Sequence, residues 1–121
     1  RQRNAPSGGA KPDADGFIPV TLRQPLQEGV GQVVRVGDVT CALYPQEGKL
    51  FALGNLCRHQ GGPIGEGRII NGCVTCPWHG YQYRANDGCS PPPFTEILPT
   101  YQVRTTATSI AIHPTPLPEG S

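Results

Sequence analysis

Two short loops constrain this chain more than any other part of its sequence. The first contains Cys57 and His59, the second contains Cys76 and His79, and sixteen residues separate His59 from Cys76. If the loops meet, they present two thiolates and two imidazoles, a donor set typical of metal sites. The fold must therefore hold together two loops that lie well apart in the chain.

Length and charge narrow the class of protein. A chain of 121 residues forms one domain at most and hides roughly 65% of its unfolded surface, enough for one modest core. Lys and Arg number 10 against 9 for Asp and Glu, and no basic run is interleaved with aromatic residues, so the pattern of a nucleic-acid binder is missing. No apolar run approaches the roughly 18 residues of a membrane span. The chain has no methionine, so we expect it to be processed or excised from a longer protein.

Short β-type runs separated by turn residues fill the chain from Gly16 to Ile112. Pro19 favours an edge position for the first run, and Gly37-Asp38 predicts a hairpin between the second and third. No window predicts a convincing helix, so the expected fold is all-β, with about nine short strands in small antiparallel sheets or an incomplete barrel. The expected strands cover residues 17–22, 32–36, 39–44, 49–53, 68–75, 101–105 and 108–112.

The two ends of the chain differ from this pattern. Residues 1–15 are polar and rich in glycine and proline, which predicts a linker or disordered tail. Residues 113–121 carry three prolines, which predicts an extended and unpacked tail, with His113 in solvent. The expected domain therefore covers residues 16–112.

Three kinds of metal site fit the cysteines and histidines by spacing alone. Zinc binds two thiolates and two imidazoles tetrahedrally. A two-iron, two-sulfide cluster would place both thiolates on one iron and both imidazoles on the other. A four-thiolate cluster would use Cys57, Cys73, Cys76 and Cys89. Because five cysteines cannot all pair within one chain, metal ligation is the better default than a disulfide framework.

The residues around the two loops resemble the Rieske iron–sulfur family. The resemblance implies a Rieske-like all-β fold with a two-loop cluster-binding subdomain and one [2Fe-2S] cluster of the Rieske type. It makes Cys57 and Cys76 the ligands of the buried iron, and His59 and His79 the ligands of the outer iron. The matching segments are Cys57-x-His59, Gly61-Gly62-Pro63-Ile64-x-x-Gly67, Cys76-Pro77-x-His79-Gly80 and Leu98-Pro99-Thr100-Tyr101-x-Val103.

Residues beside the ligands distinguish branches of this family. The respiratory branch has a disulfide that braces the loops, and the matching positions here are Gly62 and Trp78. That branch also has a serine and a tyrosine that donate hydrogen bonds toward the cluster sulfurs; Tyr81 stands at the serine position and Tyr83 matches the tyrosine. Rieske potentials run from roughly −150 to +300 mV, and without the brace we expect a lower, ferredoxin-like or oxygenase-like potential.

Other residues near the loops also receive expected roles. Trp78 lies between two ligands and is expected to shield the cluster and contact a partner. The prolines 91–93, with Pro92 at their centre, match the loop that covers the cluster in Rieske proteins. Cys41 is expected to be a small buried hydrophobe, Cys73 a packing residue near the loop base, and Cys89 a loop thiol whose role the sequence leaves open.

The resemblance implies one-electron transfer from a reductase to an oxygenase or other acceptor, with no bond chemistry on this chain. The alternative is the Rieske module of a longer or multi-component enzyme, such as an oxygenase or a nitrite reductase small subunit. A structural zinc-binding β module is the weakest alternative. The expected partners are redox proteins, the expected state is a monomer or a module, and the absent disulfide suggests a cytoplasmic location. Only His113 remains beyond the two histidine ligands, so the chain cannot supply a mononuclear iron site with two histidines.

Overall fold

The computed structural model describes residues 15–57, 61–78, 80–106 and 109–118. These residues form small antiparallel sheets and one 3-10 turn, η1, without any α-helix in the described ranges, so the all-β prediction is confirmed. In the same ranges no helix is long and apolar enough to cross a bilayer. The elements are β1 (Ile18–Pro19), β2 (Gln32–Val36), β3 (Val39–Gln46), β4 (Lys49–Gly54), η1 (Ile64–Glu66), β5 (Arg68–Ile70), β6 (Cys73–Thr75), β7 (Gln82–Arg84), β8 (Thr100–Tyr101), β9 (Val103–Thr105) and β10 (Ile110–Ile112).

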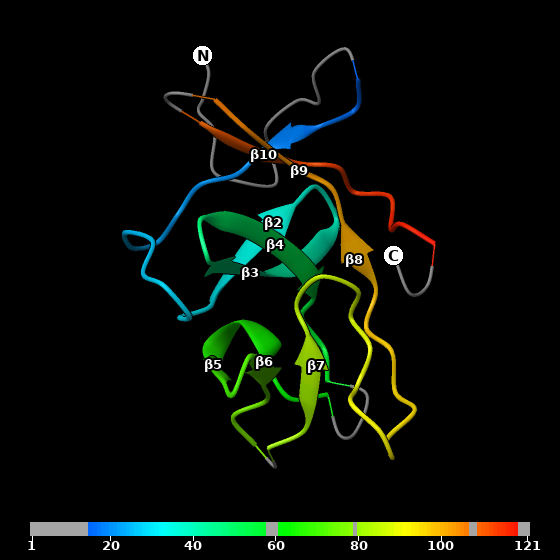
Figure 1. Cartoon of the computed structure of the whole chain (residues 1–121). Coiled ribbons are helices and arrows are strands. Elements are labelled where there is room, and N and C mark those ends of the chain that lie inside the picture. The colour runs from blue at the N-terminus through cyan, green and yellow to red at the C-terminus, as the bar shows by residue number, and fades with distance from the viewer. Residues whose placement is uncertain (1–14, 58–60, 79, 107–108, 119–121) are drawn as a thin grey trace.

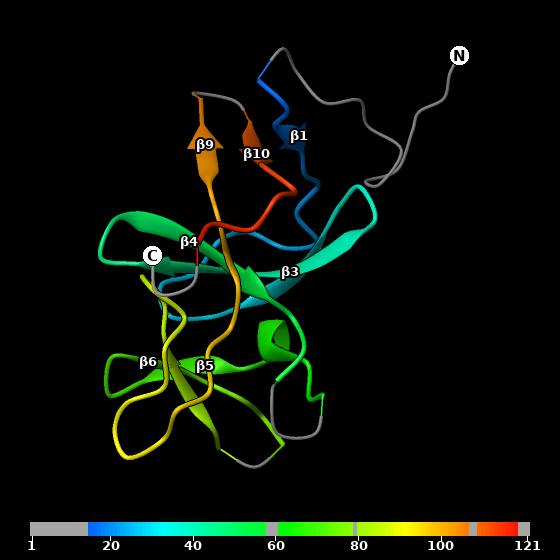
Figure 2. The same ribbon diagram turned by 90° about the vertical axis from the view of Figure 1, so that its right-hand side faces the viewer.

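The sheets are stacked in three tiers (Figure 1). The first has the strand order β1-β10-β9, the middle one β2-β3-β4-β8, and the third β5-β6-β7. Figure 2 shows the middle sheet between the other two from a second direction. Within the described residues β1 pairs only with β10, so the predicted edge position of Pro19 is confirmed.

The middle sheet is buried on both faces, and β3 is its centre. Residues 41–44 are all buried: Ala42 and Tyr44 belong to one hydrophobic core, and Cys41 and Leu43 belong to another. Successive side chains of a strand point to opposite faces. One continuous apolar run therefore supplies both cores, one toward the β1-β10-β9 tier and one toward the β5-β6-β7 tier.

The tight turns explain where the strand predictions succeeded and failed. Gly37 has a φ of 61°, as a type II′ turn requires at its first central position, so Gly37-Asp38 closes the predicted β2-β3 hairpin. Asn71 and Gly72 have φ values of 52° and 81°, which fit a type I′ turn. The prediction of one strand over residues 68–75 is therefore wrong, because this turn divides it into β5 and β6.

β3 is longer than predicted. It continues through Pro45 to Gln46, and the turn to β4 is formed by Glu47 and Gly48 instead of starting at Pro45. Proline is tolerated here because β2 pairs with β3 only as far as Leu43. The missing N–H of Pro45 therefore costs no hydrogen bond to β2. The Pro45 carbonyl accepts a bond of 2.9 Å from the N–H of Gly29 instead.

The C-terminal part of the chain connects two tiers. The predicted strand over residues 101–105 is two strands, with β8 paired to β4 and β9 paired to β10. The expectation of an unpacked tail is wrong at Leu117, whose N–H donates to the Thr100 carbonyl at 2.8 Å. His113 is not simply solvated either, because its ring packs against Phe17 with centroids 5.3 Å apart. Residues 1–14, 107–108 and 119–121 lie outside the described part, as does the predicted start of the last strand at Thr108.

Candidate metal centre

The two predicted ligand loops lie at one end of the molecule, beyond the third tier. Cys57 follows β4 and Cys76 follows β6 directly. Figures 1 and 2 both show the chain beside these cysteines, and the yellow loop after β7, gathered at that end. His59 and His79 lie outside the described residues, so the structure places half of the predicted donor set.

The two loops share one pattern of backbone hydrogen bonds. In the first, the Cys57 N–H donates to the Gly62 carbonyl at 2.9 Å, and the Gly61 N–H donates to the Cys57 carbonyl at 2.9 Å. In the second, the bonds from Cys76 to the Tyr81 carbonyl and from Gly80 to the Cys76 carbonyl measure 2.8 and 3.1 Å. Each loop is therefore closed on its own cysteine.

Glycine is required at the same point of both loops. Gly61 has a φ of 74° and Gly80 a φ of 76°, in the left-handed region that other residues rarely adopt. The matching turn lets each loop reverse four residues after its cysteine. The sequence resemblance included both glycines without showing this symmetry.

Gly62 brings the first loop against the second. A Cβ atom at this position would lie 2.6 Å from the Sγ of Cys76 and 3.1 Å from the Trp78 ring. Only glycine allows this approach without a shift of the neighbours. The two positions that carry the bracing disulfide in the respiratory branch are thus in contact here through packing alone, and all five cysteines of the chain are free.

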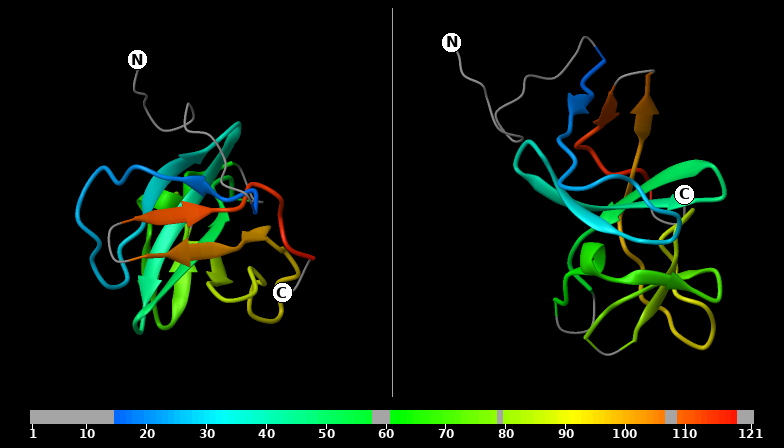
Figure 3. Two further views of the ribbon diagram at one scale, coloured as in Figure 1. Left: turned by 90° about the horizontal axis from the view of Figure 1, so that it is seen from above. Right: turned by 90° about the vertical axis from the view of Figure 1, so that its left-hand side faces the viewer.

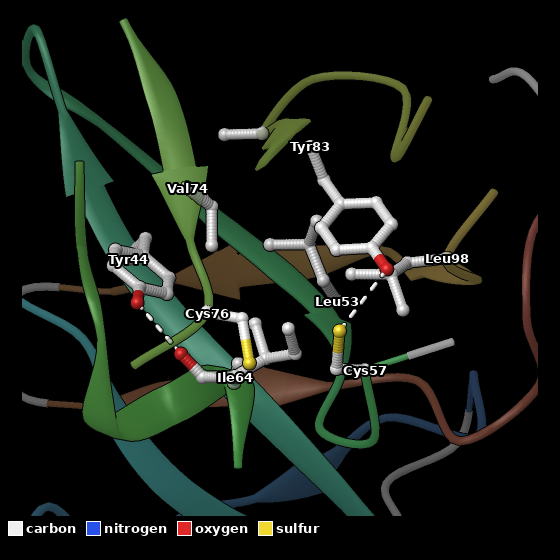
Figure 4. Packing of buried hydrophobic residues seen from close by; sticks show 10 residues of the cluster. Tyr44, Leu53, Cys57, Ile64, Val74, Cys76, Tyr83 and Leu98 are labelled. Carbon is white, nitrogen blue, oxygen red and sulfur yellow. Dashed lines mark hydrogen bonds between the residues drawn. The ribbon is translucent and has the colours of Figure 1, made fainter. Parts of the chain in front are cut away.

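Both loop cysteines are buried in the core below the loops, with exposed fractions of 4% for Cys57 and 2% for Cys76. The fully buried Tyr83 of β7 brings its hydroxyl to 3.3 Å from the Cys57 Sγ (Figure 4). In the same core the Tyr44 hydroxyl donates to the Ile64 carbonyl at 2.7 Å, which fixes the turn after the first loop. Burial holds the pKa of the Tyr44 phenol above its ordinary value, so this donor keeps its proton.

Comparison with known proteins identifies the family. Residues 16–102 match the family model of the Rieske [2Fe-2S] domain. This chain belongs to that family. A Rieske domain carries a [2Fe-2S] cluster of the Rieske type, and the zinc and four-thiolate alternatives are therefore set aside.

Solved structures share the fold of this Rieske domain. The ferredoxin of carbazole 1,9a-dioxygenase from Nocardioides aromaticivorans IC177 matches with a TM-score of 0.72 and 20% identity, over 82% of this chain and 98% of that one. A putative NADH-dependent nitrite reductase small subunit from Mycobacterium tuberculosis matches with a TM-score of 0.62 and 24% identity, over 72% of this chain and 84% of that one.

Among curated proteins, a cholesterol 7-desaturase of Ciona intestinalis is 32% identical over 89 residues, which cover 72% of this chain and 19% of the desaturase. The oxygenase component of a 3-ketosteroid-9-alpha-monooxygenase from Rhodococcus rhodochrous is 26% identical over 71% of this chain and 23% of its own length. The Rieske domain thus spans less than a quarter of the length of these relatives.

The described residues of this Rieske domain fit the thiolate half of such a cluster. Cys57 and Cys76 offer two free thiols from loops that contact each other at Gly62. The described ranges contain no group of three or more His, Cys, Asp or Glu side chains suited to a metal. The remaining predicted donors, His59 and His79, are in the part left undescribed.

Aromatic and proline residues surround the second loop. Trp78 is 55% exposed, and its predicted role as a shield and partner contact stays a prediction. The Tyr81 ring packs 5.6 Å from that of Phe94, and both residues, with Pro92, border a hollow of about 220 Å³. The proline loop thus lies against the second loop, although Pro92 itself is exposed.

Sequence reasoning missed two exposed apolar residues at this end. Leu56 is 68% exposed and Phe94 is 55% exposed. The available signal was position: Leu56 precedes a predicted ligand, and Phe94 follows the three prolines. Both place large apolar side chains in solvent near the predicted ligand loops, Phe94 through its ring contact with Tyr81.

The three other cysteines have different surroundings. Cys41 is fully buried in the core on the far face of the middle sheet, so the prediction of a small buried hydrophobe is confirmed. Burial raises the pKa of its thiol to about 12. Cys73 is three residues before Cys76 on β6, about 10 Å away along an extended strand. Cys89 lies in the turn after β7, where its N–H donates to the Asp87 carboxylate at 3.0 Å.

Arg84 and Asp87 stabilise the turn that precedes the proline loop. Their side chains form an ion pair of 3.1 Å on the surface. Although partial burial acts in the opposite direction, hydrogen bonds from Arg84 and from the Cys89 N–H lower the pKa of the Asp87 carboxyl. The carboxylate form therefore holds this turn at neutral pH.

Proposed function

We propose that this chain transfers single electrons through a Rieske cluster held by Cys57, His59, Cys76 and His79. The observation that carries this proposal is the pair of loops closed on Cys57 and Cys76 that meet at Gly62. When bound, the cluster supplies a one-electron carrier of moderate potential.

The chain's own residues hold and tune this centre in the proposed mechanism. Cys57 and Cys76 anchor it to the core, where burial keeps water from the sulfurs. The Tyr83 hydroxyl, 3.3 Å from the Cys57 Sγ, donates a hydrogen bond to the thiolate. Because a donor stabilises the more negative reduced state, Tyr83 raises the potential from the low value that the absent disulfide predicts.

The exposed apolar residues near the ligand loops form the proposed contact surface for a redox partner. Five large apolar side chains are exposed among the described residues, and Leu56, Trp78 and Phe94 are three of them. Each lies next to a ligand loop or against it. Electron-transfer encounters use small and transient interfaces, and an apolar contact here would bring a partner close to the imidazole edges expected from His59 and His79.

Two settings for this electron transfer are supported by different observations. The match covers 98% of the dioxygenase ferredoxin chain, which supports a ferredoxin that serves a reductase and an oxygenase. The small share covered in the desaturase and the monooxygenase supports a module of a longer enzyme. In either setting, we propose that substrate chemistry takes place outside this chain.

A spectroscopic experiment tests the proposal. Protein purified without oxygen should be brown, contain two iron and two sulfide per chain as a Rieske cluster requires, bleach with dithionite, and then give the reduced-Rieske electron paramagnetic resonance signal. A His113→Ala variant should keep all of these properties, whereas His59→Ala and His79→Ala should lose the signal. A colourless protein with one bound zinc would overturn the proposal.

A further inference from the structure

Three exposed arginines lie along the open side of β2, which is an edge strand of the middle sheet. Arg35 is on β2, Arg23 is in the segment before it, and Arg68 begins β5. We call this surface the arginine edge. None of the three has an ion pair with a described residue, whereas each of the other described arginines has one: Arg84 with Asp87 and Arg104 with Asp15.

Two adjacent hollows connect these arginines. The larger, of about 310 Å³, is bordered by Arg23 and Arg68. The smaller, of about 170 Å³, is bordered by Arg23 and Arg35. Both also touch Val33, so they lie side by side along β2 with Arg23 between them.

The backbone around the hollows is fixed by a buried polar side chain. Gln32 is 6% exposed, accepts a hydrogen bond from the Arg23 N–H at 3.0 Å, and donates one to the Gln24 carbonyl at 3.1 Å. Val30 forms a bridge with Arg68 on the other side. The arginine backbones are therefore held in place before any partner arrives, which lowers the entropy cost of binding.

The charge of this surface is positive after its acidic neighbours are included. Glu66 borders the larger hollow, and Asp38 lies in the turn that ends β2, where Arg35 donates to the Gly37 carbonyl at 3.3 Å. Glu28 points elsewhere, since it accepts a hydrogen bond from the Glu47 N–H at 2.8 Å. Arginine pairs well with carboxylates because its planar guanidinium donates two parallel hydrogen bonds.

The arginine edge adjoins the candidate metal centre through the backbone. The larger hollow is bordered by Gly65 and Gly67, in the turn that follows the first ligand loop. The Asn55 side chain, two residues before Cys57, accepts a hydrogen bond from the Gly65 N–H at 2.7 Å. The right-hand view of Figure 3 shows η1 and the chain before β2 on the same side of the molecule.

We propose that the arginine edge binds an acidic, extended segment of a redox partner protein. The meaning of this site for electron transfer rests on the function proposed above, but the binding itself does not. An acidic protein segment fits better than a nucleic acid because the residues that border the two hollows include no aromatic side chain on which a base would stack.

A peptide titration tests the arginine edge directly. Fluorescein-labelled hexaglutamate is titrated with the intact, cluster-loaded protein at low salt, and binding is followed by fluorescence anisotropy. We expect saturable binding that weakens as salt screens the charges, and that falls about tenfold or more in an Arg23→Gln/Arg68→Gln double variant. For the Arg23→Gln single variant, the control matched in net charge is Lys49→Gln, which removes a positive charge from an exposed position in a different hollow and should change the affinity less than about twofold.

Several outcomes would overturn the proposal. Absence of binding would show that the arginine edge is not a binding site for acidic segments. An equal loss of affinity in Lys49→Gln would show that the peptide responds only to the net charge of the protein. If inorganic phosphate at the same concentration of negative charge displaces the peptide, the surface is a small-anion site. If single-stranded DNA binds more tightly than the peptide, the surface is a nucleic-acid site. Because the titration involves no electron transfer, a failure here leaves the resonance test of the cluster unaffected, and the variants' visible spectra show that the centre is intact.

Discussion

The two faces of the middle sheet bury different kinds of core. On the face toward β1, β9 and β10, the buried members are aliphatic except for Cys41. On the face toward β5, β6 and β7, the core contains the loop cysteines and two buried tyrosines, Tyr44 and Tyr83, whose hydroxyls have bonding partners. The same strands supply both faces, so the difference comes from what the other tiers contribute.

Two buried cysteines, one in each core, show how the surroundings of a thiol differ between the two faces. Cys41 and Cys57 are both buried thiols, with exposed fractions of 0% and 4%. Cys41 lies mid-strand in β3, where apolar neighbours suppress its ionisation. Cys57 lies after a strand end, with a hydroxyl beside its sulfur and a second thiol loop in reach. Burial is therefore common to both thiols, and only the surroundings of Cys57 fit the proposed role of a ligand.

The largest expected effect contrasts these two cysteines. Cys57→Ser should remove the cluster, because the hydroxyl is a poor iron ligand, and iron content should fall close to zero. Cys41→Ala should keep full iron content and lower the free energy of unfolding by about 1 kcal/mol, the cost of a small cavity. Iron analysis and urea unfolding check both variants. Cluster loss in Cys41→Ala would mean that the two cores are coupled.

A second contrast concerns glycine at the contact between the loops. Gly62→Ala places a Cβ 2.6 Å from the Cys76 Sγ, so the loops must move apart, and we expect partial loss of iron and a loss of about 2 kcal/mol in stability. The control is Gly48→Ala, where a Cβ meets nothing within 4 Å and only the φ of 81° opposes it. The control should keep all its iron and lose about 1 kcal/mol. Equal iron loss in both variants would contradict the role given to Gly62.

The smallest contrast compares two tyrosines of one core. Tyr83→Phe removes the hydroxyl near the Cys57 Sγ and should lower the midpoint potential by about 40 mV, since a hydrogen bond of about 1 kcal/mol corresponds to that shift for one electron. Tyr44→Phe removes the bond to the Ile64 carbonyl and should cost about 1 kcal/mol of stability while moving the potential much less. A redox titration with urea unfolding separates the two effects, and equal potential shifts would contradict the assignment.

Local signals in the sequence predicted much of the fold, but one local turn and one short strand were missed. The apolar runs of β2, β3 and β4 and the Gly37-Asp38 turn were predicted because neighbouring residues determine them. The division at Asn71-Gly72 was missed although its signal is local. β7 was missed because three residues, Gln82–Arg84, carry too little pattern and form a strand only by pairing with β6.

For the candidate site, too, the sequence predicted the motif residues but not the surfaces formed by residues from distant segments. The resemblance pointed to all four ligands and to Gly62, Trp78 and Tyr83, because motif spacing is a property of the chain. The exposed Leu56 and Phe94, and the arginine edge built from Arg23, Arg35 and Arg68, join residues far apart in sequence. No spacing rule brings such residues together.

The sequence by itself predicted the ligand types and their order, and it determined the all-β class and the family, because each depends on residue identity at short range. Only the tertiary structure decided that Gly62 fits against Cys76, that Tyr83 reaches Cys57, and that His113 and Leu117 contact the domain. These are contacts between distant segments, and they follow from how three tiers bury the two faces of one sheet. Pairing and packing across the chain are cooperative, so no single segment contains them.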